Sequence, residues 1–162
     1  MALNRTVQLK KIRDEIWNLS KSPLYNYRKK NNYFPVIGEG NHFSKIIFIG
    51  EAPGQREAET GRPFCGAAGK ILDSPFLDRQ ILIIKPKIIA TLGRFSTKYI
   101  LEKFNLSEKN ESITNLHGKV IEAKVPFGKT KIIPLYHPAV VLYSAGSRKV
   151  LEEDFRILKD LV

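Results

Sequence analysis

The chain alternates short apolar runs with longer stretches in which apolar and charged residues recur at helical spacing. Three runs have the length and β-branched composition of buried strands: residues 46–49 (IIFI), 87–92 (KIIATL) and 131–136 (KIIPLY). Three stretches have the pattern of amphipathic helices: residues 4–19, 76–85 and 148–161. Strands that alternate with helices predict an α/β fold with a parallel sheet.

Other segments carry turn or loop signals. Residues 119–124 and 131–136 flank Pro126-Phe127-Gly128, and this arrangement predicts a β-hairpin. Residues 105–115 are polar and predict a loop. Residues 25–32 (YNYRKKNN) predict an exposed segment, which either meets a phosphate backbone or is a solvated loop.

Each of the three predicted strands ends in a turn. The turns are GEAPG at residues 50–54, Gly93-Arg94, and His137-Pro138-Ala139. If the strands are parallel, these turns meet at the carboxyl edge of one sheet, where open α/β sheets bind ligands. The pattern therefore predicts one cleft that contains the side chains of Glu51, Glu57, Phe64, Arg94 and His137.

The segment at residues 45–72 is richer in turn residues than a simple connection requires. Gly50 and Gly54 allow sharp turns and expose backbone N–H groups, and Pro53 stiffens the loop. A second loop, residues 61–66 (GRPFCG), lifts one aromatic ring, and residues 67–72 predict the start of a helix. A tight structural turn would explain the glycines but not the two acids.

A phosphate-binding P-loop is excluded in this segment. Gly69-Lys70 would need glycine at position 64 and serine or threonine at position 71. The chain has Phe64 and Ile71.

Composition adds one strong constraint. The 162 residues carry a net charge of +11, which is typical of nucleic-acid binders, although solvated surface lysines are the alternative. A single cysteine excludes both a disulfide framework and a cysteine-based metal site. The sequence shows no signal peptide and no membrane-spanning run, so we expect one cytoplasmic domain over residues 1–162, monomeric and without a membrane partner.

The predicted cleft suits one kind of chemistry. His137 is held by the proline after it, and a neutral imidazole N–H there can stabilise an oxyanion. A carboxylate can orient water or stabilise a cationic sugar, and the ring of Phe64 offers a stacking face for a base. Together with a basic surface, these groups predict cleavage of an N-glycosidic bond in a nucleic acid. His42 and His117 lie in polar turns and are predicted to be bystanders.

These motifs make the chain resemble the type-4 uracil-DNA glycosylases. The resemblance rests on GEGN, on GEAPG followed by GRPF and the AGKIL helix, on IKPKIIATLGR, and on YHPA with the closing helix. It implies a three-layer αβα sandwich with a mostly parallel central sheet, and base excision repair of uracil in single- or double-stranded DNA.

The resemblance also implies roles for individual residues. Phe64 would stack on uracil and His137 would contact its O2. Glu51 and Glu57 would be the acids linked to the water molecule and to the organisation of the site. The remaining implied residues are Gly50, Ala52, Pro53 and Gly54 for the substrate, and Pro138, Ala139, Arg148 and Lys149 for DNA, in the loop at residues 138–148 and directly after it.

The chain departs from the family at its cofactor. The family holds a [4Fe–4S] cluster with four cysteines, but Leu19 and Ser22 occupy two of these positions and the segment that carries the other two is absent after Leu72. One edge strand and the asparagine that recognises uracil are expected to be missing with it. We therefore expect no cofactor and no metal, with residues 46–49 as the new edge strand. Two functions stay open: a reduced uracil-DNA glycosylase, and a non-catalytic DNA-binding remnant.

Overall fold

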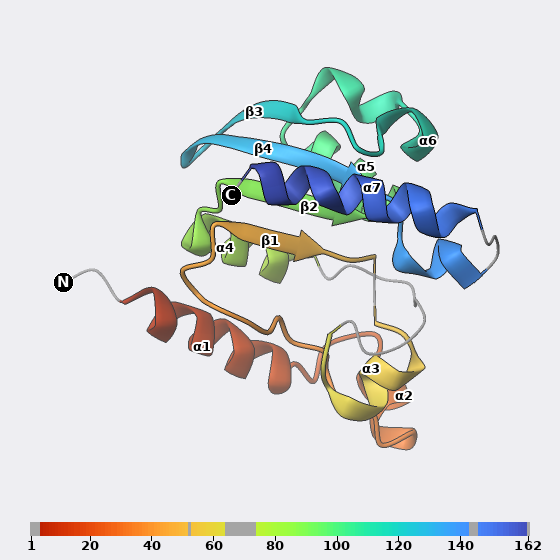
Figure 1. Ribbon diagram of the computed structural model, residues 1–162. Helices are drawn as coiled ribbons and strands as arrows, with labels where there is room; N and C mark the ends of the chain where they lie inside the picture. Colours follow the sequence, from red (N-terminus) through yellow and green to blue (C-terminus); the bar gives the residue numbers. More distant parts are fainter. Residues whose placement is uncertain (1–3, 52, 64–73, 143–145, 162) are drawn as a thin grey trace. The chain divides into compact units, whose positions relative to one another are not determined.

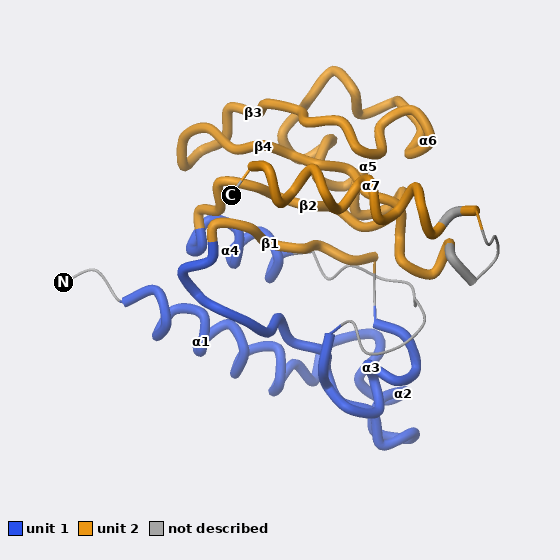
Figure 2. The backbone as a smooth tube through the Cα atoms, viewed as in Figure 1, with its two compact units in different colours: residues 1–44, 52–84 blue, residues 45–51, 85–162 orange. Residues whose placement is uncertain are grey.

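The computed structural model describes residues 4–51, 53–63, 74–142 and 146–161 (Figure 1). The backbone groups into two compact units (Figure 2). The first contains residues 1–44 and 52–84, and the second contains residues 45–51 and 85–162. The expectation of a single domain stays a prediction.

The second unit is built on a four-stranded sheet in the order β1-β2-β4-β3. Its strands are β1 (Ile46–Ile49), β2 (Ile88–Leu92), β3 (Ile121–Val125) and β4 (Gly128–Leu135). β1, β2 and β4 run parallel, and β3 pairs antiparallel with β4. The predicted strands, their parallel arrangement and the hairpin are confirmed. Among the described residues, β1 stands at one end of the sheet, where the sequence predicted an edge strand.

Helices cover both faces of this sheet. The helical segments of the unit are α5 (Arg94–Lys103), η1 (Ser107–Asn110), α6 (Ile113–Leu116), η2 (Pro138–Leu142) and α7 (Ser147–Asp160). On one face, Leu158 of α7 packs against Ala90, Leu92 and Ile133 of the two central strands. On the other face, Thr97 of α5 hydrogen-bonds Thr91 of β2. The unit therefore has three layers, αβα, as predicted (Figure 1).

The core lies around β2 and β4. All five residues of β2 are buried, which explains its continuous apolar pattern. At the sheet edge, Phe48 of β1 is 43% exposed and stacks on Phe155 of α7, with ring centroids 6.0 Å apart. One aromatic contact thus covers the outer strand on the α7 face.

The first unit is helical in the residues that the structure describes. Its helices are α1 (Arg5–Trp17), α2 (Tyr25–Lys30), α3 (Gln55–Thr60) and α4 (Ser74–Ile84). α1 packs against α4, with Ile12 and Ile81 fully buried. Arg79 and Glu15 form an ion pair between the two helices, and the hydrogen bond from Arg79 lowers the pKa of Glu15. The predicted helices at residues 4–19 and 76–85 are confirmed with shifted ends.

Several short helical segments were not predicted. α2 lies in the segment predicted to be exposed, and its side chains are outside the core, so only the backbone conformation differs from the prediction. α3 lies between the two predicted glycine-rich loops, and η1 and α6 lie in and at the end of the predicted polar loop. The predicted helix start at residues 67–72 falls outside the described residues. In the described part of the chain, no helix combines the length and the apolar character needed to cross a membrane.

Candidate functional site

The turn after β2 brings an acid and a histidine together. A Cβ built on Gly93 would lie 3.2 Å from Glu51 Oε2 and 3.2 Å from His137 Cβ. Glu51 follows β1, Gly93 follows β2 and His137 follows β4, so the carboxyl ends of all three parallel strands meet here. The structure therefore brings Glu51 and His137 to the same edge of the sheet, next to Gly93.

Gly93 has a structural reason to be glycine. Its φ is +91°, a conformation that side-chain-bearing residues rarely adopt. The residue is also buried, next to the side chains of Glu51 and His137. A larger residue would be strained and would push either the carboxylate or the imidazole away.

Hydroxyl groups of α5 hold this turn rigid. Thr97 Oγ1 and Ser96 Oγ donate to the Gly93 carbonyl at 2.8 and 3.2 Å, and both side chains are buried. The Gly93 N–H donates to the Leu135 carbonyl at 2.9 Å, which ties the turn to the end of β4. The site is thus built on a braced backbone rather than on a free loop.

The hydrogen bonds of His137 define which ring nitrogen can donate. Its Nδ1 accepts the backbone N–H of Ala139 at 3.2 Å, and its carbonyl accepts that of Val140 at 2.9 Å. A nitrogen that accepts a hydrogen bond carries no proton, so the hydrogen of the neutral ring lies on Nε2. The half-buried imidazole therefore presents an N–H donor, the form needed to stabilise an oxyanion.

Glu51 is a half-buried carboxylate next to this histidine. Within the described ranges, no side chain or backbone donor hydrogen-bonds its carboxylate. Arg94, the residue after the glycine, lies over the ring of Phe95, 4.4 Å from the centroid, and both side chains are exposed.

The second acid, Glu57, belongs to the other unit and has a local task. It is 5% exposed, and its Oε2 accepts the backbone N–H of Gly54 at 3.0 Å. This bond closes the first turn of α3 from its third residue, as in half of a capping box. Gly54 is buried and Pro53 is exposed, whereas the predicted residues Ala52 and Phe64 lie outside the described residues. Gly50 is half-buried between β1 and Glu51.

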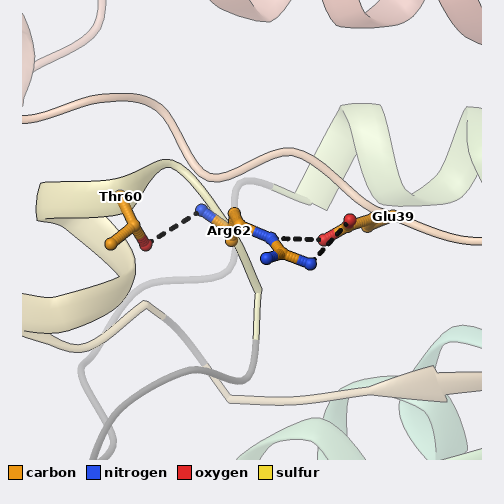
Figure 3. Close-up of polar contacts among 3 residues, drawn as sticks. All are labelled: Glu39, Thr60 and Arg62. Carbon is orange, nitrogen blue, oxygen red and sulfur yellow. Dashed lines mark hydrogen bonds and ion pairs between the residues drawn. The ribbon is translucent and has the colours of Figure 1, made fainter.

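The loop that leads towards Phe64 is anchored at its start. Arg62 donates to both carboxylate oxygens of Glu39, from Nε at 3.2 Å and from Nη2 at 3.0 Å (Figure 3). The Arg62 backbone N–H also approaches Thr60 Oγ1 at 3.4 Å. This exposed ion pair joins the GEGN motif, which contains Glu39, to the GRPF loop, which contains Arg62.

The predicted DNA-contacting residues lie around η2 and the start of α7. Pro138, Arg148 and Lys149 are exposed, and Ala139 is half-buried. Arg148 Nε pairs with Glu152 at 2.9 Å, one helical turn further on. Such an exposed pair is worth little in stability, so the guanidinium can be redirected to a phosphate at small cost.

His117 makes a tertiary contact that the sequence did not indicate. Its Nδ1 lies 3.0 Å from the buried carboxylate of Asp154. The two residues are 37 positions apart, so no local pattern connects them. His42 Nδ1 lies 3.1 Å from Thr6 Oγ1 in a half-buried contact. That both histidines are bystanders to the chemistry stays a prediction.

The described residues therefore define an αβα protein with a carboxylate and an N–H donor held together at the carboxyl edge of three parallel strands. The described residues contain no group of three or more His, Cys, Asp or Glu side chains that could hold a metal ion. Sequence comparisons identify the kind of protein that has this arrangement.

The model of the "Uracil DNA glycosylase superfamily" matches residues 37–74 and 72–159. The chain is 39% identical to the type-4 uracil-DNA glycosylase of Sulfurisphaera tokodaii over 191 aligned residues, which cover 94% of this chain and 84% of the relative. It is 38% identical to that of Saccharolobus solfataricus, covering 92% and 84%, and 33% identical to that of Archaeoglobus fulgidus, covering 91% and 89%. The chain thus belongs to the uracil-DNA glycosylase superfamily, in its type-4 family.

Proposed function

We propose that this protein is a DNA repair enzyme that hydrolyses the N-glycosidic bond of uracil in DNA and leaves an abasic site. Water supplies the oxygen that bonds to the sugar carbon as the bond from that carbon to the base breaks. The electron pair of the broken bond leaves with uracil, whose negative charge needs a donor. The observation that carries this proposal is the pair formed by Glu51 and His137 on either side of Gly93.

His137 would stabilise the departing base. Its Nε2–H is a hydrogen-bond donor on a neutral ring. We assign this donor to the uracil O2, where negative charge develops. Comparable preorganised donors contribute about 3–4 kcal/mol to transition-state stabilisation. A neutral donor can act this way without first losing or gaining a proton.

Glu51 would act on the sugar side of the same bond. An uncommitted carboxylate can orient the attacking water and stabilise the positive charge that develops on the sugar. Glu57 would organise the loop instead, since it accepts the Gly54 N–H. Phe64, together with the backbone at Gly50, Ala52, Pro53 and Gly54, is assigned to the base.

The enzyme would work without the family's iron–sulfur cluster. Four thiolates are needed for such a cluster, and the chain has one cysteine, Cys65. Leu19 and Ser22 stand where two ligands are expected, and Ser22 Oγ accepts the backbone N–H of Leu24 at 3.3 Å. These residues do not fit a [4Fe–4S] cluster, and no step of the reaction involves one.

An internal gap near residue 72 would account for the missing ligands. The superfamily model matches in two segments that overlap at residues 72–74. The alignment with the S. tokodaii relative spans 191 positions, although this chain has 162 residues. Both features support a deletion between the AGKIL segment and α4, where the family's edge strand would lie.

DNA is the partner of this superfamily, and the net charge of +11 supports it here. We assign contacts along the strand to Pro138, Ala139, Arg148 and Lys149. Selectivity for uracil, a monomeric state and a cytoplasmic location remain predictions from the sequence. The alternative of a non-catalytic DNA-binding remnant is not favoured by the relatives, which carry an enzyme's name.

One experiment tests the proposal. The protein is incubated with a labelled single-stranded oligonucleotide that contains one uracil, and the product is treated with alkali. We expect cleavage at the uracil with the wild type and none with His137→Ala. An oligonucleotide that stays intact with the wild type, yet is bound by it, would favour the non-catalytic remnant.

A further inference from the structure

A second histidine–carboxylate pair lies next to the end of β4. His117 Nδ1 is 3.0 Å from both Oδ1 and Oδ2 of Asp154, which belongs to α7 and is 4% exposed. A carboxylate only accepts hydrogen bonds, so Nδ1 carries a proton and the ring has a fixed orientation. This pair joins the turn after α6 to the closing helix (Figure 1).

The turn that carries His117 is shaped for this contact. Gly118 has a φ of +73°, and a Cβ on it would lie 2.8 Å from Asp154 Oδ1. Any larger residue would therefore collide with the carboxylate. The Gly118 N–H donates to the Pro134 carbonyl at 2.9 Å, which fastens the same turn to β4.

One aromatic residue, Tyr136, lies between the His117 ring and the site. The rings of His117 and Tyr136 are stacked, with centroids 4.3 Å apart and planes inclined by 29°. Tyr136 directly precedes His137. The buried Asp154 carboxylate thus connects through His117 and Tyr136 to the backbone that presents His137.

We propose that Asp154 and His117 are positioning residues that set the direction of His137 Nε2–H through Tyr136. This inference rests on the role of His137 in the proposed function. Stability alone is a weak reason for such a pair, because apolar side chains of similar volume often replace buried ion pairs without loss of stability. An apolar side chain in place of Asp154 would not hold the His117 ring in one orientation. Tyr136 stacks on that ring, so its position depends on the pair.

The central test compares Asp154→Ala with Asp154→Asn. Asparagine keeps an oxygen that accepts the proton of His117 Nδ1, whereas alanine removes it. Three quantities are measured in each variant: the NMR signals of the His137 ring in the free protein, the single-turnover rate of uracil excision, and the affinity for DNA. For alanine we expect altered His137 ring signals and a rate lower by about tenfold, since misplacement by 1 Å costs up to about a hundredfold. DNA affinity should stay unchanged, and asparagine should preserve both signals and rate.

Two further variants separate positioning from stability. Tyr136→Ala removes the ring that stacks on His117 but leaves His117 paired with Asp154. It should therefore alter the His137 signals and lower the excision rate as Asp154→Ala does. If Asp154→Ala does not fold, Tyr136→Ala tests the inference in its place. Ile88→Ala removes apolar contacts from the buried cluster that β2 and β4 form with Leu158 of α7. Ile88 lies at the start of β2, at the end of the strand away from Gly93. This variant should lower the melting temperature without altering the His137 signals.

Two results overturn the inference: unaltered His137 signals in both disrupting variants, or equal effects of asparagine and alanine at position 154. If the wild type excises no uracil at all, the proposed function fails. The ring signals of the free protein still decide whether Asp154 and His117 position His137.

Discussion

Replacing Gly93 by alanine tests the geometry of the site most directly. The substitution has two separate costs. The first is backbone strain, because the native φ is +91°, and a residue with a side chain in such a region costs about 1–3 kcal/mol. The second is crowding, because the new methyl group would lie 3.2 Å from both Glu51 Oε2 and His137 Cβ.

The crowding can be converted into an expected loss of rate. Carbon atoms in ordinary contact are about 3.5–4.0 Å apart, so one or both side chains must move by a few tenths of an ångström. A displacement of 1 Å costs up to about a hundredfold in rate, so we expect Gly93→Ala to excise uracil about tenfold more slowly. The free energy of unfolding should fall by about 1–3 kcal/mol, and DNA affinity should be unchanged.

Gly128→Ala is the matched control. Gly128 also has a positive φ, +121°, but a Cβ built on it meets no atom within 4 Å. The control therefore suffers backbone strain without crowding and lies at the start of β4, away from the site. Single-turnover excision is measured well below both melting temperatures. If Gly93→Ala excises uracil as fast as Gly128→Ala, Glu51 and His137 do not depend on this turn and the assigned site is wrong.

The remaining predictions concern the cofactor, the DNA and the substrate. Purified protein should contain no iron, because only Cys65 is left as a thiolate ligand; stoichiometric iron with visible iron–sulfur absorbance would contradict this. DNA binding should weaken steeply as salt rises, because lysine and arginine displace counterions from phosphates; an affinity that is insensitive to salt would exclude the basic surface as the DNA site. Excision should be slow, fastest in single strands or mismatches, and less selective than in a full-length relative, because the asparagine that recognises uracil is expected to be missing. Phe64→Ala should weaken it and His137→Ala abolish it, and a fast enzyme that tolerates both changes would place the chemistry elsewhere.

The central strand of the sheet could be predicted because it is buried on both faces. β2 is apolar at nearly every position, and the structure buries all five of its residues. The three turns after the parallel strands then followed from topology, which is why Glu51 and His137 could be placed at one edge from the sequence. Their meeting point, Gly93, was visible only as the end of a strand.

Short helices escaped prediction for a physical reason. α2 and α3 have six residues each, too few for a helical repeat to become visible. The ends of α3 did carry signals: Glu57 stands three residues after Gly54, and Gly61 ends the helix in the left-handed conformation. These glycines were attributed to rigid loops instead. The contact between His117 and Asp154 left no sequence signal, because tertiary packing alone joins residues so far apart.

The two acids at positions 51 and 57 could not be distinguished by sequence, and their environments now separate them. The carboxylate of Glu57 is buried and accepts the N–H of Gly54, so part of its hydrogen-bonding capacity maintains the loop. Glu51 is half-buried beside His137, and no donor in the described part of the chain bonds its carboxylate. A group that must respond to developing charge needs oxygens that are not already committed to the fold. We therefore assign the chemistry to Glu51 and the shape of the loop to Glu57, a division between two carboxylates that their spacing alone does not determine.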